Sequence, residues 1–393
     1  MPAETPADSK RKVERGELAP GCPAHAGPDN VWKVQDFGTA RAMLRHTETR
    51  QAGFGIERFD RVGGKMRMPV LFRDGVEHRE HRRQTAKYFT PKKVDSSYRE
   101  LMGRLADEQC DLLCRRGEAD LSQLSFRLAV GVAAEVIGLT ESGPGMAKRL
   151  NRFFAEHSGT PGWRNPKAAY QQWRSNLNVA LFYWRDVRPA VTARKAESRD
   201  DLISHLLSEG CNKAEILSEC ITFAAAGMIT TREFITVAAW HLFSDDALRL
   251  AYLEGTEKER VAILHEILRL EPVVGRLFRR TTAEIQVGDV TIPAGARLDI
   301  SVAATNLDPA AAGPNPGAVC PARPVADGFG DAGLSFGDGP HRCPGAYIAI
   351  QETDTFLTKL FALPGLTLVQ EPTTRIRPEI SSYELVGMRL KVS

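Results

Sequence analysis

The stretch Phe336-Gly-Asp-Gly-Pro-His-Arg-Cys-Pro-Gly345 places one cysteine, Cys343, in a glycine-broken loop directly before an apolar, helix-like run from Ala346 to Leu360. A cysteine at a helix N-terminus lies near the positive end of the helix dipole and near unpaired N–H groups, which favour thiolate over thiol. The glycines of the loop allow the backbone to approach a flat, bulky group closely. The alternative is a buried structural cysteine in a turn, which is the common fate of a free cysteine.

The spacing Phe-x-x-Gly-x-x-x-Cys-x-Gly, formed here by Phe336, Gly339, Cys343 and Gly345, resembles the haem-binding signature of the cytochrome P450 family. Four fixed residue types within ten positions make this match specific. The resemblance implies that Cys343 is the axial ligand of haem b (iron protoporphyrin IX), where electron donation from sulfur favours O–O cleavage. It also implies the fold of that family, which is mainly α-helical with small β-sheets.

The bulk composition is that of an ordinary globular protein. Of the 393 residues, 42% are apolar and 26% are charged, and the net charge is +3. This small charge gives no reason to expect a nucleic-acid or membrane-surface partner. The seven cysteines, at positions 22, 110, 114, 211, 220, 320 and 343, include no Cys-x-x-Cys pair and no zinc-like spacing. We therefore expect reduced thiols in a cytoplasmic protein.

The chain divides by composition into a short arm and one long unit. Residues 1–28 are rich in Pro, Ala, Gly and charge and lack an apolar signal core, so we expect a flexible arm. No apolar run reaches the roughly 18 residues of a membrane span. Residues 29–270 have mainly helical patterns. Residues 276–304 have strand patterns, with a turn at Gly288-Asp289 between two of the strands, and residues 305–340 predict a long ordered loop. Without a clear linker, we expect a single haem domain over 29–393.

A nearly all-apolar run from Asn212 to Phe243 predicts a buried central helix, and Glu215 gives its start the spacing of a capping box. Inside this run, Gly227 costs up to about 1 kcal/mol. A threonine three residues later can bond back to the preceding turn and loosen it. Taken alone, these residues favour a close helix–helix contact at Ala226 and Gly227.

The segment Ala226-Gly-Met-Ile-Thr-Thr231 also resembles the oxygen-binding groove of the family, where an opened helical turn admits dioxygen and a threonine hydroxyl helps to deliver protons. Thr230 takes the hydroxyl position, but Ile229 occupies the acidic position and cannot relay protons. Protons would then come through Thr230 and Thr231 with water, or from the substrate. The alternative is a reaction with less proton demand, such as oxidative C–C or C–N coupling or ring closure without oxygen insertion. The catalytic residues implied by the resemblance are Ala226, Gly227, Ile229, Thr230 and Thr231.

Thr256-Glu-Lys-Glu259 predicts a second capping box, at the start of a helix that ends before Pro272. Glu266 and Arg269 lie at i and i+3 on this helix. An exposed pair with this spacing stabilises a helix by roughly 0.2–0.5 kcal/mol. The family resemblance implies a larger structural role, in which both residues join Arg323 to lock the loop under the haem.

Haem carries two propionates, and their burial requires cations. By family position these are His78 and Arg82, at i and i+4 on one helix, together with Arg279 and His341. The alternative for each is a solvated surface charge. We retain that alternative for His81, Arg83 and Arg280.

The resemblance extends from about residue 30 to the end, with its motifs in the family's order. It implies a haem-thiolate monooxygenase that oxidises a small or medium organic substrate with dioxygen and two electrons from a ferredoxin and its reductase. Use of peroxide in place of those electrons is one alternative, and a non-catalytic haem sensor or carrier is another.

Substrate contacts are implied by family position alone. They are the loop Val62–Phe72, including Phe72, and Phe223, Met228, Val273, Val274, Leu277 and Tyr383. Three loop cations, Arg61, Lys65 and Arg67, would meet an anionic substrate. A basic docking face for the electron donor would consist of Arg79, Arg83, Lys92, Lys93 and Arg342.

Overall fold

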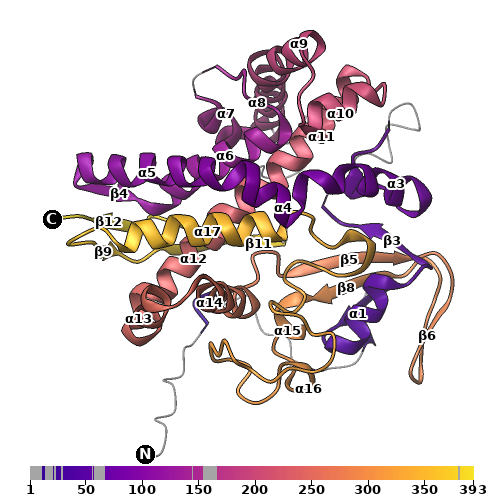
Figure 1. Ribbon diagram of the computed structural model, residues 1–393. Coiled ribbons are helices and arrows are strands. Elements are labelled where there is room, and N and C mark those ends of the chain that lie inside the picture. The colour runs from indigo at the N-terminus through magenta and orange to yellow at the C-terminus, as the bar shows by residue number, and fades with distance from the viewer. Residues whose placement is uncertain are drawn as a thin grey trace, which may run out of the picture.

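The computed structural model describes residues 11–13, 21, 24–27, 30–54, 56, 67–143, 145–153, 166–378 and 381–393. Over these residues the protein is mainly helical with small sheets at one side, as the sequence predicted (Figure 1). The helices are α1 Phe37–Arg45, α3 Gly75–Thr85, α4 Pro91–Lys93, α5 Arg99–Arg116, α6 Leu121–Ile137, α7 Met146–Phe153, α8 Pro166–Phe182, α9 Arg188–Ala196, α10 Leu202–Ser208, α11 Lys213–Ala224, α12 Thr230–Ser244, α13 Asp246–Glu254, α14 Glu257–Leu270, α15 Val302–Thr305, α16 Pro309–Ala312 and α17 Ala346–Phe361.

The largest sheet has five strands in the order β1-β2-β8-β5-β3, and its parallel pair joins Val31–Val34 (β2) to Arg297–Ser301 (β8). The remaining pairs of this sheet are antiparallel. The other strands form three smaller antiparallel groups. The further strands are β1 His25–Ala26, β3 Thr49–Ala52, β4 Glu118–Asp120, β5 Arg276–Thr281, β6 Ile285–Val287, β7 Val290–Ile292, β9 Thr367–Gln370, β10 Thr373–Arg377, β11 Ser382–Val386 and β12 Arg389–Lys391.

The predicted hairpin and both predicted capping boxes are present. β6 and β7 pair around Gly288, which has a φ of 55°. Asn212 accepts hydrogen bonds from the first turn of α11 while Glu215 accepts from the Asn212 N–H, at 2.9 Å. Thr256 and Glu259 form the same arrangement at the start of α14. These local signals therefore placed the element boundaries correctly.

A helical rod from Lys213 to Ser244, made of α11, a π-helical turn η7 (Ala225–Ile229) and α12, crosses the middle of the molecule. Phe234, Val237 and Leu242 of this rod belong to a core shared with α5, α6, α14 and α17. By length and composition the rod could also cross a membrane, which the sequence analysis did not anticipate. However, 56% of its most apolar window is buried inside the protein, so it is a core helix here.

The predicted flexible arm is packed wherever it is described. Val13 is fully buried, and its N–H donates to Glu271 at 3.3 Å. His25–Ala26 form a short strand against β2. The expectation of a free arm is wrong for these residues, because a buried carboxylate and an edge strand give the arm partners that lie far away in sequence. Residues 1–10, 14–20, 22–23 and 28 lie outside the described residues.

Candidate active site

The cysteine loop is held against α1. Asp338 accepts hydrogen bonds from Arg41, at 3.1 Å, and Arg45, at 2.8 Å, and it caps the Gly339 N–H at 2.7 Å. Gly339 has a φ of 65°, and a Cβ at this position would lie 2.7 Å from the Leu44 carbonyl oxygen. Glycine is therefore required here both by backbone conformation and by the close approach of α1.

Cys343 lies at the end of this loop, two residues before Gly345, the N-cap of α17. Its N–H donates to the Phe336 carbonyl at 2.8 Å, which closes the loop on itself. Cys343 is a free cysteine and is exposed, so its sulfur is available for a ligand bond. Phe336 itself packs against the main core.

Burial raises the pKa of the Cys343 thiol, while the Gly345 N–H and the charges of Arg82 and Arg342 act in the opposite direction. The sequence predicted that the helix N-terminus would favour the thiolate. The Gly345 N–H acts in the predicted direction, but in the protein alone desolvation by the atoms packed round the sulfur outweighs it, although the residue keeps an exposed face. A bound metal ion reverses that balance, since a coordinating thiol is deprotonated outright.

The central helix opens at the predicted position. The π-helical turn Ala225–Ile229 interrupts it, and Ala226 is exposed there although the helix crosses the core. The Thr230 hydroxyl donates to the Ala226 carbonyl at 2.5 Å, as expected for a threonine that loosens the preceding turn. A Cβ on Gly227 would lie 3.7 Å from the Ala133 Cβ of α6, an ordinary contact. The widened turn and the predicted helix–helix contact are thus both present.

Three of the residues predicted to bind propionates lie together. The rings of His78 and His341 stack with centroids 4.0 Å apart, and His341 Nε2 lies 2.9 Å from Asp74 Oδ1. Arg82 donates to the carbonyl of Arg342, the residue next to Cys343, at 2.5 Å. Burial lowers the pKa of His78 to about 3, so His78 is neutral at pH 7. In the protein alone His78 is therefore a neutral hydrogen-bonding group, and an anionic group bound beside it would act to raise this pKa.

Arg279 is a buried cation with neutral partners. Its guanidinium donates to Gln51 Oε1 at 2.5 Å and to the Phe278 carbonyl at 2.9 Å. Burial lowers its pKa to about 10, although Asp74 acts against this from a distance. Within the described part of the chain, neither Arg279 nor Arg82 forms an ion pair with a carboxylate. A buried cation such as Arg279 and a partly buried one such as Arg82 are stabilised by an anionic group, which the two propionates of haem would supply, so these residues fit the cofactor.

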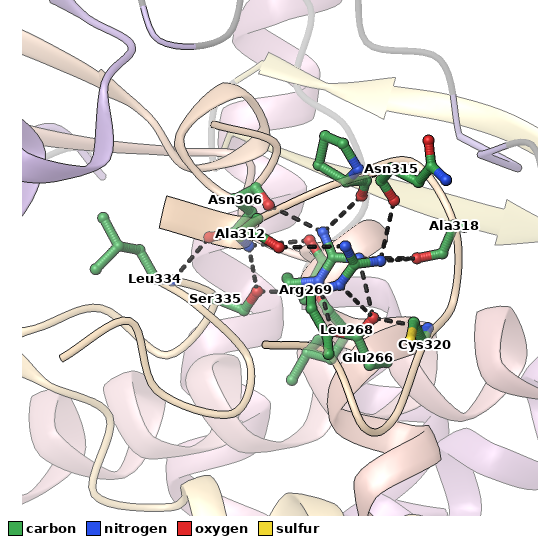
Figure 2. Close-up of polar contacts among 12 residues, drawn as sticks. Glu266, Leu268, Arg269, Asn306, Ala312, Asn315, Ala318, Cys320, Leu334 and Ser335 are labelled. Carbon is green, nitrogen blue, oxygen red and sulfur yellow. Dashed lines mark hydrogen bonds and ion pairs between the residues drawn. The ribbon is translucent and has the colours of Figure 1, made fainter. Parts of the chain in front are cut away.

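Glu266, Arg269 and Arg323 meet as the sequence predicted. Arg269 is fully buried and binds Glu266 through two bonds of 2.6 and 3.0 Å, and Arg323 Nε binds the same carboxylate at 3.2 Å. Both arginines also donate to backbone carbonyls of the irregular segment 306–318, and Figure 2 shows several of these contacts. The cluster therefore fixes the chain that leads into the cysteine loop.

Sequence reasoning missed a second part of this scaffold. The Asn306 side chain donates to the Arg269 carbonyl at 3.0 Å and to the Ser335 hydroxyl at 2.8 Å, and it accepts from the Leu334 N–H at 2.7 Å. Ser335 in turn donates to the Leu268 carbonyl at 2.8 Å (Figure 2). An asparagine and a serine in a Gly- and Pro-rich loop gave no signal that distinguishes them from turn residues.

The predicted substrate contacts separate into two groups. Met228 and Tyr383 are fully buried and Val273 nearly so, and the Tyr383 hydroxyl donates to the Glu271 carbonyl at 3.3 Å. All three side chains belong to the hydrophobic core clusters. The others are only partly buried: Phe72, Phe223, Val274 and Leu277.

Two of the partly buried side chains have defined neighbours. Phe223 stacks on Phe89 with ring centroids 5.9 Å apart. Leu277 lies next to the cysteine loop, since a Cβ on Gly337 would be 3.7 Å from its Cδ1. Residues 62–66 of the predicted substrate loop, together with Arg61 and Lys65, lie outside the described residues.

Two glutamates of α11 hold the described end of that loop, and sequence reasoning missed both contacts. Glu215 accepts from the Arg67 N–H and Glu219 from the Val70 N–H, each at 3.0 Å. Arg73 lies 3.4 Å from Glu219, and His81 Nε2 lies 3.8 Å from it. Burial and the charge of Arg73 lower the pKa of His81 to about 4, so His81 and Glu219 are not an ion pair at pH 7. These contacts clamp the loop to the central helix.

We expect the free energy of unfolding of Glu219→Gln, relative to that of the wild type, to be greater at pH 8 than at pH 5. Burial raises the pKa of Glu219 from its ordinary 4.5 to about 7, so the folded state holds a proton that the unfolded state releases. Stability therefore falls as pH rises from about 4.5 to 7, by up to about 3 kcal/mol at 1.36 kcal/mol per pKa unit. Glutamine keeps the acceptor for Val70 and abolishes this loss. Urea unfolding of both proteins at pH 5 and pH 8 measures the difference.

The exposed glutamate Glu100 provides the control, since Glu100→Gln removes a carboxylate that is not buried. The same pH-dependent difference for both variants would show that Glu219 has no special contribution. His81 has the opposite effect on the pH dependence of stability. Because its pKa is lowered in the folded state, the free energy of unfolding falls as pH falls from about 6.5 to 4.

Comparison with known proteins agrees with this geometry. The cytochrome P450 family model matches residues 261–370, which include Glu266, Arg269, Arg323 and Cys343. Erythromycin C-12 hydroxylase of Saccharopolyspora erythraea is 28% identical over 88% of this chain and 85% of its own length. Mycinamicin IV hydroxylase/epoxidase of Micromonospora griseorubida is 29% identical over 78% of this chain and 75% of its own length.

Among solved structures, P450BioI in complex with an acyl carrier protein that carries hexadec-9Z-enoic acid has a TM-score of 0.76. At 22% identity over 94% of each chain, this similarity shows the fold. The protein is a haem-thiolate oxidoreductase by fold and by family match. It belongs to the cytochrome P450 family, of the bacterial type, and is a monooxygenase whose cofactor is haem.

Proposed function

We propose that the protein oxidises a small or medium organic molecule in the cytoplasm, using dioxygen and two electrons from a ferredoxin and its reductase. The observation that supports this most directly is the exposed thiol of Cys343, with Arg82 bonded to the neighbouring Arg342 carbonyl and with Arg279 buried; among the described residues neither cation forms an ion pair with a carboxylate. Haem bound there supplies the activation of dioxygen. No substrate name follows from the site, because such pockets are mostly apolar and shaped by loops.

The chain's own residues then have separate roles. Cys343 would hold the iron and Arg82 and Arg279 would bind the propionates, with the stacked rings of His78 and His341 beside them. The Thr230 hydroxyl lies at the opened turn, where its proton is shared with the Ala226 carbonyl. That hydroxyl would be the group of this turn that can hold and release a proton, and the widened turn Ala225–Ile229 would leave space beside it.

The electron-donor surface is smaller than the sequence indicated. Arg83 is bound to Glu80 at 2.7 Å, and Lys93 is bound to Asp200 at 2.8 Å, so their charges are locally compensated. Arg79, Lys92 and Arg342 are exposed. We propose these three as the cations that meet an acidic ferredoxin.

A ligand screen tests the proposal. Purified ferric protein is titrated with a panel of organic compounds, and those that shift the haem spectrum are turned over with a ferredoxin and reductase. Products one oxygen atom heavier than the substrate support the monooxygenase. Equal turnover with hydrogen peroxide alone would favour the peroxide alternative, and ligand binding without any product would favour a sensor.

Ile229 favours a second candidate function, which is oxidative coupling or ring closure. Isoleucine cannot carry a proton to the Thr230 hydroxyl, so the substrate itself is an alternative proton source, and a coupling substrate gives up two hydrogens in the reaction. Product mass distinguishes the two candidates, since coupling removes hydrogens and insertion adds oxygen.

If hydroxylation is the reaction, Ile229→Asp increases product formation. A positioned carboxylate typically contributes about 10²–10⁴-fold to a proton-dependent step, so we expect a gain of at least about tenfold in product per electron pair consumed. Ile229→Asn is the matched control, because its side chain has the same shape as aspartate but no ionisable proton. Loss of product in the Asp variant with intact haem binding would instead favour coupling.

Substrate supply on a carrier protein is a further candidate, suggested by the P450BioI complex. Its support in this chain is an exposed helix face on α8 and α9 that carries aromatic and basic side chains.

A further inference from the structure

The rod formed by α8, the π-helical turn η6 (Tyr183–Val187) and α9 exposes a continuous row of large apolar side chains. It lies at the top of the view in Figure 1, well apart from the cysteine-bearing end of α17. The members and their exposed fractions are Tyr170 (58%), Trp173 (60%), Leu177 (44%), Leu181 (38%) and Trp184 (56%). We call these five residues the aromatic stripe.

The stripe lies on one face of the rod. Its members are separated by three, four, four and three residues, which is the repeat of a single helix face. From Tyr170 to Trp184 it extends about 21 Å, at 1.5 Å per residue. The rings are also held in place, because Tyr170 stacks on Trp173 at 6.0 Å and the Arg188 guanidinium lies 4.6 Å from the Trp184 ring. Rigid tryptophan and tyrosine side chains are the residues that dominate protein–protein binding energy.

Positive charge accompanies the stripe. Between residues 169 and 196 the chain has one acidic residue, Asp186, which is fully buried and bonded to Arg149 at 2.8 Å. The exposed charged side chains over the same residues are all cations: Arg174, Arg185, Arg188 and Lys195.

Two of these cations lie along one edge of the aromatic stripe. Arg174 and Arg185 each directly follow a stripe tryptophan, so both project about 100° from it in the same direction round the helix. The opposite edge carries Asn176 and Ala180, which are exposed and uncharged. The rod thus has an apolar centre, one basic edge and one neutral edge.

We infer that the aromatic stripe and its basic edge are the docking surface for a separate acidic protein of the carrier-protein kind, which presents an amphipathic helix with one acidic edge. The inference adds a partner to the proposed function and holds for either hydroxylation or coupling. A helix laid along the stripe buries its apolar side on the rings and pairs its acidic edge with Arg174 and Arg185. A second copy of this chain packed with the two rods antiparallel would bring two basic edges together. A lipid surface would contact both edges of the rod at once, although only one is basic.

Binding of a fatty-acyl carrier protein to the full-length, haem-loaded chain tests the inference. Four double variants are compared with the wild type by calorimetry at low and moderate salt. Trp173→Ala with Trp184→Ala removes both tryptophan rings of the aromatic stripe. Arg174→Glu with Arg185→Glu reverses the charge of its basic edge. The matched controls alter exposed residues on other helices: Leu250→Ala with Leu253→Ala, and Arg115→Glu with Arg116→Glu.

We expect saturable binding that weakens with salt, falls at least tenfold in both stripe variants and stays within twofold in both controls. Haem spectra and thermal unfolding curves show that the variants remain folded. No binding, or equal binding by stripe and control variants, overturns the inference. It is also overturned if anionic-lipid vesicles bind through the stripe while the carrier protein does not. Self-association that the tryptophan variant abolishes would likewise assign the surface to a second copy.

Discussion

Cys343→Ser is expected to abolish the ferrous carbon-monoxide absorption band that gives the cytochrome P450 family its name. That band requires a thiolate opposite the gas ligand, and serine replaces sulfur with an oxygen that binds iron poorly. Serine is nearly the same size as cysteine, and the Cys343 N–H bond to the Phe336 carbonyl does not involve the side chain. The loop should therefore keep its shape while the spectrum changes. Difference spectroscopy of the reduced protein with carbon monoxide measures the effect.

Cys114→Ser is the matched control, since Cys114 is also an exposed free cysteine but lies on α5. We expect it to keep the full band. Wild-type protein that binds haem but shows no such band, or a Cys343→Ser variant that retains it, would refute Cys343 as the ligand.

Arg269→Ala is expected to have the largest effect on stability, about 3–5 kcal/mol in the free energy of unfolding. Arg269 is fully buried. Its guanidinium donates two hydrogen bonds to Glu266 and further bonds to the carbonyls of Asn306, Pro316 and Ala318. Alanine removes a donor from the carbonyls of Asn306 and Pro316, leaves the Ala318 carbonyl with Arg323 alone, and leaves the Glu266 carboxylate with only part of its compensation. Urea unfolding followed by far-ultraviolet circular dichroism measures the loss.

The consequence should extend to the cofactor. Because the irregular segment 306–318 leads into the cysteine loop, we expect the Arg269→Ala protein to retain less haem than the wild type. Arg104→Ala is the control: Arg104 binds Glu108 at 3.0 Å on the surface of α5, where such a pair contributes about 0.2–1 kcal/mol. Similar losses for both variants would mean that the buried cluster has no special stabilising role.

A double variant tests whether the cluster acts as a unit. Removal of Glu266 and Arg269 together should cost less than the sum of the single losses, because each single variant leaves the other charge buried and unpaired. Strict additivity would contradict the three-residue network.

Local sequence signals predicted most of the elements that carry the site. Capping residues at Asn212 and Thr256, the turn at Gly288 and the glycine-broken loop before Cys343 all act within a few residues. The loosened turn near Thr230 was also predicted, since a hydroxyl that bonds back to the preceding turn is a local interaction. Ordered motifs along the chain predicted that Glu266, Arg269 and Arg323 would meet.

Only the tertiary structure decided burial, protonation and pairing between distant segments. Met228 and Tyr383 have side chains suited to a pocket, yet they fill the core because helices and strands far away in sequence close over them. His78 is neutral and the Cys343 thiol has a raised pKa for the same reason, which is desolvation by segments that sequence alone could not place beside them. Sequence therefore determined which local conformations form and which motifs the chain carries. The packing of remote segments determined which side chains face the core, which remain exposed and which keep their charge.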